Sequence, residues 1–196
     1  MKRLMMVVAI SVAISGCFEK ESANEGLARS ISAVESIETA NNSPDATVKS
    51  WWIVKDASAA VRIEVCKNNL KLAEPYFEKL SQLSADSLLG KGECGQKPPS
   101  FDRQIKKVDV QSETRAVVTV HIKNVTPPEE GSVLDDEAKK AKDAGEPFQY
   151  VLERKDAKNG WKITKIASFP SYASDWKDVY VKPEPSNNRY VYGFYQ

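Results

Sequence analysis

The chain offers few side chains for covalent or acid–base chemistry. Its 196 residues include three cysteines, Cys17, Cys66 and Cys94, and a single histidine, His121. A thiol can carry a lipid, join another thiol in a disulfide or bind a metal ion, and the spacing of the residues helps to decide between these fates. Cys66, Cys94 and His121 lie far apart in the sequence, so their spacing does not favour a metal site.

Cys17 follows a segment with the layout of a secretory signal. Lys2 and Arg3 give a positive start, residues 4–14 are apolar except for one serine, and small residues come directly before the cysteine. This order of charged end, short apolar stretch and small residues is typical of a removable signal. A cysteine at this place resembles the lipobox of bacterial lipoproteins, in which the cysteine is diacylated and becomes the new N-terminus.

The resemblance implies a signal peptide over residues 1–16, a lipid on Cys17 and a tether over residues 17–42. An ordinary signal peptide followed by an incidental cysteine is the alternative. Stable anchoring needs two or more acyl chains, because one chain binds a membrane only reversibly. In enterobacterial lipoproteins an aspartate after the acylated cysteine retains the protein at the inner membrane. This chain has Phe18 there, which favours the outer membrane and a body facing the periplasm.

The balance of positive and negative residues disfavours two classes of binding partner. Removing Lys2 and Arg3 with the signal leaves 26 Lys and Arg against 27 Asp and Glu. A near-neutral body does not favour nucleic-acid binding, which needs a basic face, nor polybasic attraction to anionic lipid. The expected partners are the membrane, reached through the lipid on Cys17, and an envelope protein or a toxin.

The other two cysteines form a natural pair if Cys17 carries a lipid. Exported proteins mature in an oxidising setting, where a disulfide between Cys66 and Cys94 would persist. Closing this loop of about 29 residues would stabilise the fold by about 3–4 kcal/mol. Two free thiols are the alternative.

The first half of the chain has helical periodicity. Residues 27–34 carry apolar side chains at helical spacing, which fits either a short docked helix or a linker. Ser43-Pro44-Asp45 is a stronger helix start, with a capping serine, a proline in the first turn and an acid near the positive helix end. We expect this helix to break near residues 56–58, and a second helical run to kink or restart at Pro75.

From Phe101 the periodicity changes to that of strands. We expect a strand over residues 106–110, a second over 116–123, a third from Phe148 and a fourth over 161–166. Asn159-Gly160 is a strong hairpin signal, and residues 134–144 can form a short helix. Helices packed on about four antiparallel strands give an α+β domain. One face of the second strand carries Ala116, Val118, Val120 and Ile122, and the other carries Val117, Thr119, His121 and Lys123.

The order of these elements resembles the nuclear-transport-factor-2-like superfamily, and more narrowly its uncharacterised bacterial lipoprotein members. A capped helix carrying Trp51-Trp52, a second helix and a sheet ending in Gly160-Trp161-Lys162-Ile163-Thr164-Lys165-Ile166 carry the resemblance. It covers residues 43–167 and implies a curved sheet wrapped around the long helix as a cone, with a pocket at the open end. Some members are isomerases or dehydratases, and many are binding domains.

The chain departs from the catalytic members of that superfamily. Those use a pocket aspartate or an Asp/His pair. His121 alternates with polar residues on its strand, so it is either a pocket base or a solvated side chain. Asp56 would lie near the mouth of a cone but has no histidine nearby in the sequence. Nucleophile-elbow, paired-histidine and phosphate-loop motifs are absent. We expect a protein that is not an enzyme, with no catalytic residue, cofactor or metal.

Aromatic residues mark two further features. A set in the body could line a small apolar cavity or simply fill the core. The extension over residues 168–196 holds eight of the chain's 17 aromatic residues, more than a disordered tail would keep. It either wraps its own domain as a last strand or offers a partner surface. The cavity set is Trp51, Trp52, Phe148, Tyr150 and Trp161, and the partner-surface set is Tyr190, Tyr192 and Phe194.

The sequence therefore predicts a membrane-anchored, periplasm-facing lipoprotein that acts as a non-enzymatic binding or protein-interaction module. One alternative is an immunity lipoprotein that neutralises a toxin delivered into the periplasm. Another is a small-ligand binder or enzyme that uses the cone pocket. The residues alone identify no ligand.

Overall fold

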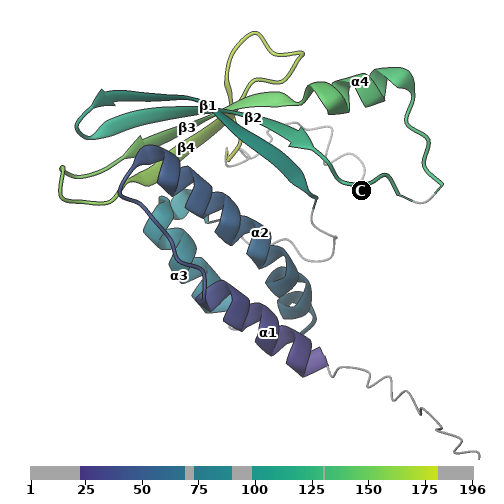
Figure 1. Cartoon of the computed structure of the whole chain (residues 1–196), viewed down its shortest axis with the longest axis horizontal. Helices are drawn as coiled ribbons and strands as arrows, with labels where there is room; N and C mark the ends of the chain where they lie inside the picture. Colours follow the sequence, from purple (N-terminus) through teal and green to yellow (C-terminus); the bar gives the residue numbers. More distant parts are fainter. Residues whose placement is uncertain (1–22, 69–72, 90–98, 130, 181–196) are drawn as a thin grey trace, which may run out of the picture.

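The computed structural model describes residues 23–68, 73–89, 99–129 and 131–180, with the backbone alone over 23–27 and 58–68. These residues form four α-helices and a five-stranded antiparallel sheet. Three helices lie on one side of the sheet (Figure 1). The strand order β1-β2-β3-β4-β5 follows the sequence. The predicted α+β class is confirmed, with one strand more than expected.

The first helix, α1 (Ala23–Glu35), is docked on the body. Val34 is 1% exposed, and Ile31 packs against the core. Of the two alternatives for this segment, the helix is therefore correct for its described residues. The apolar spacing of 27–34 was the signal that indicated it.

The long helix α2 (Pro44–Asn68) runs without interruption, so the break predicted near residues 56–58 is wrong. After Pro44 the helix contains neither glycine nor proline, and its alanines favour helix. Its start is as expected. The Ser43 hydroxyl accepts a hydrogen bond from the N–H of Ala46 at 3.4 Å and donates one to Asp45 at 2.8 Å.

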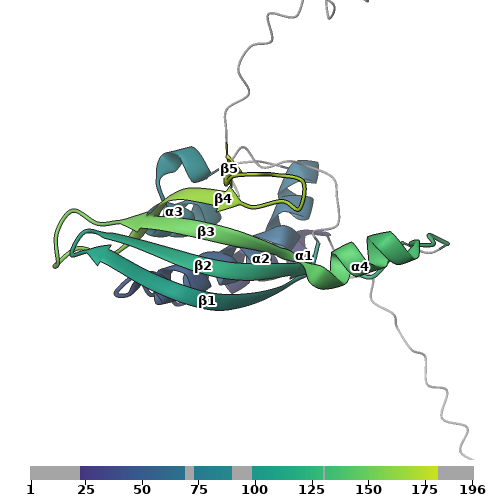
Figure 2. The same ribbon diagram turned by 90° about the horizontal axis from the view of Figure 1, so that it is seen from above.

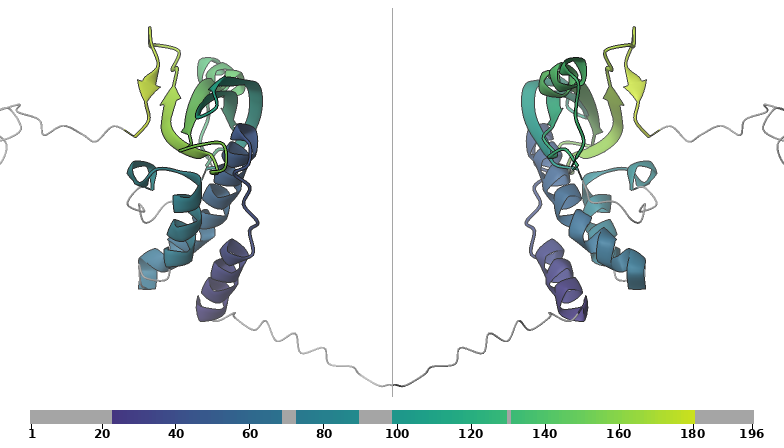
Figure 3. Two further views of the ribbon diagram at one scale, coloured as in Figure 1. Left: turned by 90° about the vertical axis from the view of Figure 1, so that its left-hand side faces the viewer. Right: turned by 90° about the vertical axis from the view of Figure 1, so that its right-hand side faces the viewer.

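The third helix, α3 (Glu74–Leu83), has Pro75 in its first turn. The restart predicted from this proline is confirmed, because a proline at the first turn has no intrahelical amide to lose. Figure 3 shows α1, α2 and α3 side by side below the sheet. The N-terminal end of α1 is the part of this layer farthest from the sheet (Figures 1 and 3).

The sheet is a meander of neighbouring strands. Its members are β1 (Phe101–Ser112), β2 (Arg115–Asn124), β3 (Glu146–Glu153), β4 (Lys162–Ser168) and β5 (Lys177–Asp178). Figure 2 shows β1 at one edge and β5 at the other.

The prediction for the first strand, residues 106–110, was too short. Strand β1 lies at the edge, so most of its side chains are exposed and its alternation of polar and apolar residues is weak. A bulge between Ile105 and Lys107 also shifts the alternation by one residue. The edge position and the bulge together hid the first half of this strand.

The alternation predicted for β2 is confirmed. Ala116, Val118 and Val120 are fully buried on the helix-facing side, and Ile122 packs against the core. The opposite side carries His121, which therefore faces away from the helices. The helix-facing side of the sheet meets the helices in one core that includes Val48, Trp51, Val54, Leu80, Leu83, Leu152, Ile163 and Ile166.

The hairpin expected at Asn159-Gly160 exists, but its turn lies earlier. A carboxylate oxygen of Asp156 accepts from the N–H of Lys158 at 2.9 Å and from the side chain of Asn159 at 2.7 Å. Gly160 does not have the positive φ of a two-residue turn of type I′. It is instead the place where the loop passes close to Asn41.

Helix α4 (Asp136–Ala144) falls within the predicted residues 134–144 and projects beyond the sheet (Figure 2). It buries no side chain. The Asp135 side chain caps it by accepting from the N–H of Ala138 at 2.7 Å. At its other end Gly145 has φ 64° and leads directly into β3. Helix α4 is therefore held at its two ends rather than by a packed face.

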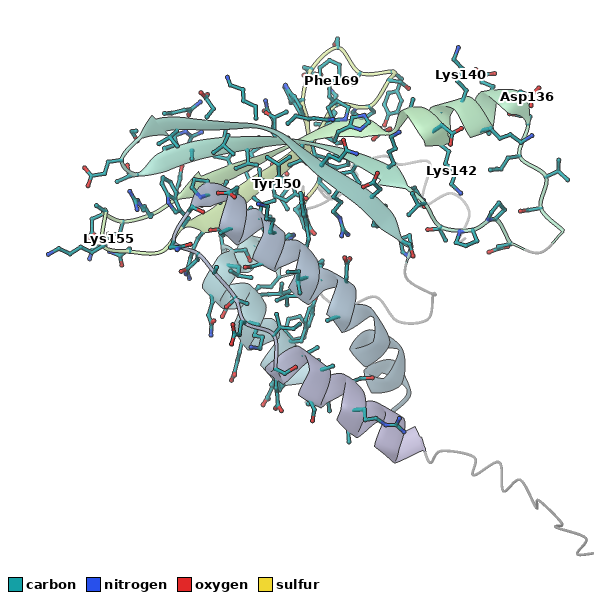
Figure 4. The ribbon with its side chains drawn as sticks, viewed as in Figure 1. Asp136, Lys140, Lys142, Tyr150, Lys155 and Phe169 are labelled. Carbon is teal, nitrogen blue, oxygen red and sulfur yellow. The ribbon has the colours of Figure 1, made fainter. Side chains whose placement is uncertain are left out.

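Some of the described residues of the aromatic extension pack on their own domain. Strand β5 pairs with β4, and Phe169 meets Trp176 edge to face at 5.4 Å. Phe169 lies above the sheet, on the side away from the helices (Figure 4). Tyr172, however, is 87% exposed, so within residues 168–180 the self-packing alternative is supported by the pairing of β5 and the Phe169–Trp176 contact but not by every aromatic side chain. Tyr190, Tyr192 and Phe194 lie outside the described residues.

Candidate functional site

The contact between Trp52 and Tyr150 is the centre of the candidate site. Trp52 lies on the flank of α2, and its indole N–H donates to the Tyr150 hydroxyl at 2.9 Å. The two rings meet edge to face, with centroids 6.0 Å apart. Tyr150 belongs to β3, and its side chain extends from the sheet toward the helices (Figure 4). The hydrogen bond thus joins the long helix to the middle of the sheet.

The Tyr150 phenol is neutral at neutral pH, and burial keeps it neutral to a higher pH than an exposed tyrosine. The side chain is 4% exposed, and burial raises the pKa of Tyr150 to about 12, although the Trp52 hydrogen bond and the Arg103 charge act in the opposite direction. A phenol with this pKa holds its proton at neutral pH. Tyr150 can donate and accept hydrogen bonds, but it is not a phenolate base.

A salt bridge lies beside this pair. Two nitrogens of Arg103, on β1, donate to the two carboxylate oxygens of Asp56, on α2, at 2.6 and 2.8 Å. The Arg103 side chain is 14% exposed, and that of Asp56 is 57% exposed. The guanidinium lies 5.7 Å from the Trp52 ring centre and 5.1 Å from that of Phe101. The cation is thus enclosed by rings, and its carboxylate partner faces solvent.

Sequence reasoning named Asp56, Trp52 and Tyr150 but missed Arg103. Asp56 was placed near a helix end, and it lies within α2. Arg103 was missed because the predicted strand began at residue 106. The signal was present in the sequence: Phe101, Arg103 and Ile105 alternate, which places them on one side of a strand.

The aromatic residues predicted to line a cavity occupy different places. Trp51 and Trp161 are 2% and 3% exposed and belong to the core. Phe148 is half-buried and packs against that core. Trp52 and Tyr150 are the members whose contact the structure defines. The candidate site is therefore narrower than the predicted set.

The predicted cysteine chemistry stays a prediction. Cys17 and Cys94 lie outside the described residues, and Cys66 lies in the stretch of α2 for which the backbone alone is described. The lipid on Cys17 and the disulfide are therefore not tested by the structure.

The described residues offer neither a metal-binding cluster nor a membrane-spanning helix. No group of three or more His, Cys, Asp or Glu side chains among them is placed to hold a metal ion. None of the helices in this part of the chain combines the length and apolar character needed to cross a bilayer. His121 lies on the sheet face opposite the Trp52–Tyr150 contact, so it is separate from the site.

Comparison of the chain with protein-family models, curated proteins and solved structures gave no match. The geometry of the Trp52–Tyr150 and Arg103–Asp56 contacts defines the chemistry of the site. It offers a guanidinium, a neutral phenol and two aromatic rings, a set suited to binding an anion or an acceptor group.

Proposed function

We propose that this protein is a lipid-anchored binding module of the bacterial cell envelope that faces the periplasm and performs no catalysis. The observation that carries the binding role is the unequal burial of the Arg103–Asp56 pair. Among the described residues, Asp56 is the ion-pair partner of Arg103. A cation enclosed by rings and neutralised by a solvent-exposed carboxylate can exchange that partner for another acceptor.

The position of α1 supports the anchoring part of the proposal. Five residues separate Cys17 from Ala23, where α1 begins. A chain of this length spans at most about 20 Å, at about 3.3–3.6 Å per residue. A lipid on Cys17 would therefore keep the outer end of α1 near the bilayer. The sheet lies at the opposite end of the helical layer (Figure 3), so it would face the periplasm.

The nuclear-transport-factor-2-like identity and the cone shape belong to the same proposal. The order of helices followed by a meander sheet supports them. So does the position of α2, whose residues contact β1, β2 and β4. In such a cone the Arg103–Asp56 pair would lie at the open side, between the long helix and the edge strand. Phe18 after the acylated cysteine supports placement in the outer membrane.

The anchoring part is tested on the full-length protein produced in bacteria. Mass analysis of the N-terminal peptide is expected to find a diacylated or triacylated Cys17, and the protein is expected to sediment with membranes. The Cys17→Ala variant should lose both properties. An unmodified Cys17 in the native protein would contradict the anchor.

The binding part is tested by placing a photo-crosslinking residue at Phe101, beside Arg103. The matched control places it at Val133, which is 91% exposed in the loop before α4. We expect light-dependent adducts at position 101 that are absent at position 133. Identical adduct patterns at both positions would argue against a binding site at Arg103.

A further inference from the structure

The position of Arg103 indicates what the site could bind. Its guanidinium is close to two rings, Trp52 and Phe101. Contacts of a cation with ring faces persist when the carboxylate partner leaves. Asp56, in contrast, is held by the two hydrogen bonds from Arg103 and is otherwise open to solvent. Arg103 is thus the fixed member of the pair, and Asp56 is the one that can be replaced.

Tyr150 supplies a second, unused group. Its hydroxyl oxygen accepts from Trp52, but its own hydrogen has no acceptor among the described residues. A buried donor without an acceptor is unfavourable and is uncommon in folded proteins. Tyr150 and Arg103 both contact the Trp52 side chain: the Tyr150 hydroxyl accepts from its indole N–H at 2.9 Å, and the Arg103 guanidinium lies 5.7 Å from its ring centre. The Tyr150 hydroxyl and the Arg103 guanidinium therefore lie beside the same region between α2 and the sheet.

The geometry points to a site for a small carboxylate-bearing ligand with an apolar body, whose carboxylate replaces Asp56 on Arg103 and accepts a hydrogen bond from Tyr150. Such a ligand would lay its apolar part against the Trp52 ring. This inference rests on the proposed binding function and specifies the chemical class of the ligand.

Asp56 itself is the reason to expect a carboxylate. Its two oxygens each accept from a different nitrogen of Arg103, which is the paired geometry that a guanidinium offers to carboxylates. A ligand carboxylate can pair with Arg103 in the same way. Because it is not attached to α2, it can also shift toward the Tyr150 hydroxyl, to which Asp56 makes no hydrogen bond in this structure. A neutral ligand of the same shape would gain the ring contact but not the ion pair.

The test uses the full-length protein in detergent, with sodium benzoate as the probe and benzamide as its neutral counterpart. Affinity is measured by calorimetric titration, and the site is located from the Trp52 indole N–H signal in NMR spectra, assigned by its loss in Trp52→Phe. Benzoate is expected to bind weakly and to shift this signal, and benzamide is not.

Variants separate the roles of the residues. Asp56→Asn removes the competing charge and should tighten benzoate binding by about fivefold. Arg103→Gln should abolish the binding, and Tyr150→Phe should weaken it by about fivefold. If Arg103→Gln does not fold, Arg103→Lys keeps the charge without the paired nitrogens and should also lose most of the affinity.

A matched control is available on the same sheet. Glu153 pairs with Arg115 across β2 and β3, with both side chains about half exposed. Glu153→Gln removes the charge paired with Arg115, as Asp56→Asn removes the charge paired with Arg103, and it should leave benzoate binding unchanged. An equal gain in both variants, or no gain in folded Asp56→Asn, would overturn the proposed carboxylate site.

Failure of the carboxylate-ligand proposal can be distinguished from failure of the proposed binding function. Site-specific adducts at position 101 with no benzoate response in Asp56→Asn would reject the carboxylate ligand and keep the binding role. A benzoate response with an unmodified Cys17 would support the ligand class and reject the anchor.

Discussion

The main-chain carbonyl of Asn41 accepts a hydrogen bond from the N–H of Trp161 at 2.8 Å. Asn41 lies just before α2, and Trp161 lies just before β4. The contact therefore fixes the beginning of the long helix against the hairpin between β3 and β4. It is also the reason that Gly160 has no room for a side chain.

Gly160→Ala should destabilise the fold. A Cβ at position 160 would lie 2.3 Å from Nδ2 and 2.4 Å from Cγ of Asn41, which is too close for non-bonded atoms. We expect a loss in the free energy of unfolding toward the lower end of the range of about 1–3 kcal/mol found at overpacked sites, because the atoms in the way belong to the Asn41 side chain, which can turn aside. Urea unfolding of the full-length protein measures it.

The Asn41 side chain, with which a Cβ at position 160 would clash, can be removed separately. In the Asn41→Ala background the atoms that Gly160→Ala would meet are gone, so the same change should cost less there. The two changes are then non-additive. A cost that is equal in both backgrounds would show that the Asn41 side chain is not the obstacle.

Tyr150→Phe should alter the dependence of stability on pH at high pH. The pKa of Tyr150 is about 12 in the fold and about 10 in an unfolded chain, so the folded state holds the proton more tightly. The stability from this group is complete below pH 10 and is lost as the pH rises toward 12, by about 2–3 kcal/mol.

The measurement is the difference in unfolding free energy between the native protein and Tyr150→Phe, recorded at pH 8 and at steps from pH 10 to 12. Taking the difference cancels the titration of the other tyrosines and lysines. The advantage of the native protein should shrink across this interval. A difference in unfolding free energy that stays constant over this pH interval would mean that burial does not raise the pKa of Tyr150.

Several elements could be predicted because their signals are local. Pro75 predicts the start of α3 through its missing amide. The alternation of Ala116, Val118 and Val120 identifies the buried face of β2, since a central strand is covered on that side. Helix α4 follows from residues with high helix propensity after a capping aspartate.

The candidate site could be predicted only in part, because its contacts are distant in sequence. Arg103 and Asp56 are 47 residues apart, and Trp52 and Tyr150 are 98 apart. Their pairing depends on which side of β1 faces α2. The bulge after Ile105 and the exposed edge obscured that side in the sequence. The short β5 was missed for a similar reason, since two residues carry no periodicity.

Ser43→Ala should destabilise α2 at its start. The change removes the hydrogen bond to the N–H of Ala46 and the one to Asp45, and loss of such a cap costs about 0.5–2 kcal/mol. The Ser43 hydrogen bond and then Lys49 hold the pKa of Asp45 below its usual value. The contribution of this carboxylate is therefore present at neutral pH and lost as acid protonates it.

Unfolding of Ser43→Ala and of the native protein at pH 7 and at about pH 3, below the usual carboxyl range, tests both statements. The difference between the two should be smaller at pH 3 than at pH 7, because the stabilisation from this carboxylate starts to fall below the ordinary carboxyl pKa and is lost as the pH falls through the lowered pKa of Asp45. Ser36→Ala is a suitable control, since Ser36 lies just after the C-terminal end of α1 and donates to the Ala33 carbonyl. An equal loss of unfolding free energy in Ser36→Ala would contradict a specific capping role of Ser43.

Gly145→Ala should be more harmful than Gly131→Ala, although both glycines have positive φ, 64° and 82°. A side chain held at such a sparsely populated positive φ costs about 1–3 kcal/mol by itself, and Gly145, with ψ −173°, also lies outside the left-handed helical region. At Gly131 a Cβ would meet nothing within 4 Å, whereas at Gly145 it would lie 2.6 Å from the main-chain oxygen of Ile122. Main chain cannot move aside as a side-chain end can, so we expect Gly145→Ala to cost at least about 1 kcal/mol more. Thermal unfolding of the two variants gives the comparison, and equal losses would show that the end of α4 can separate from β2 without penalty.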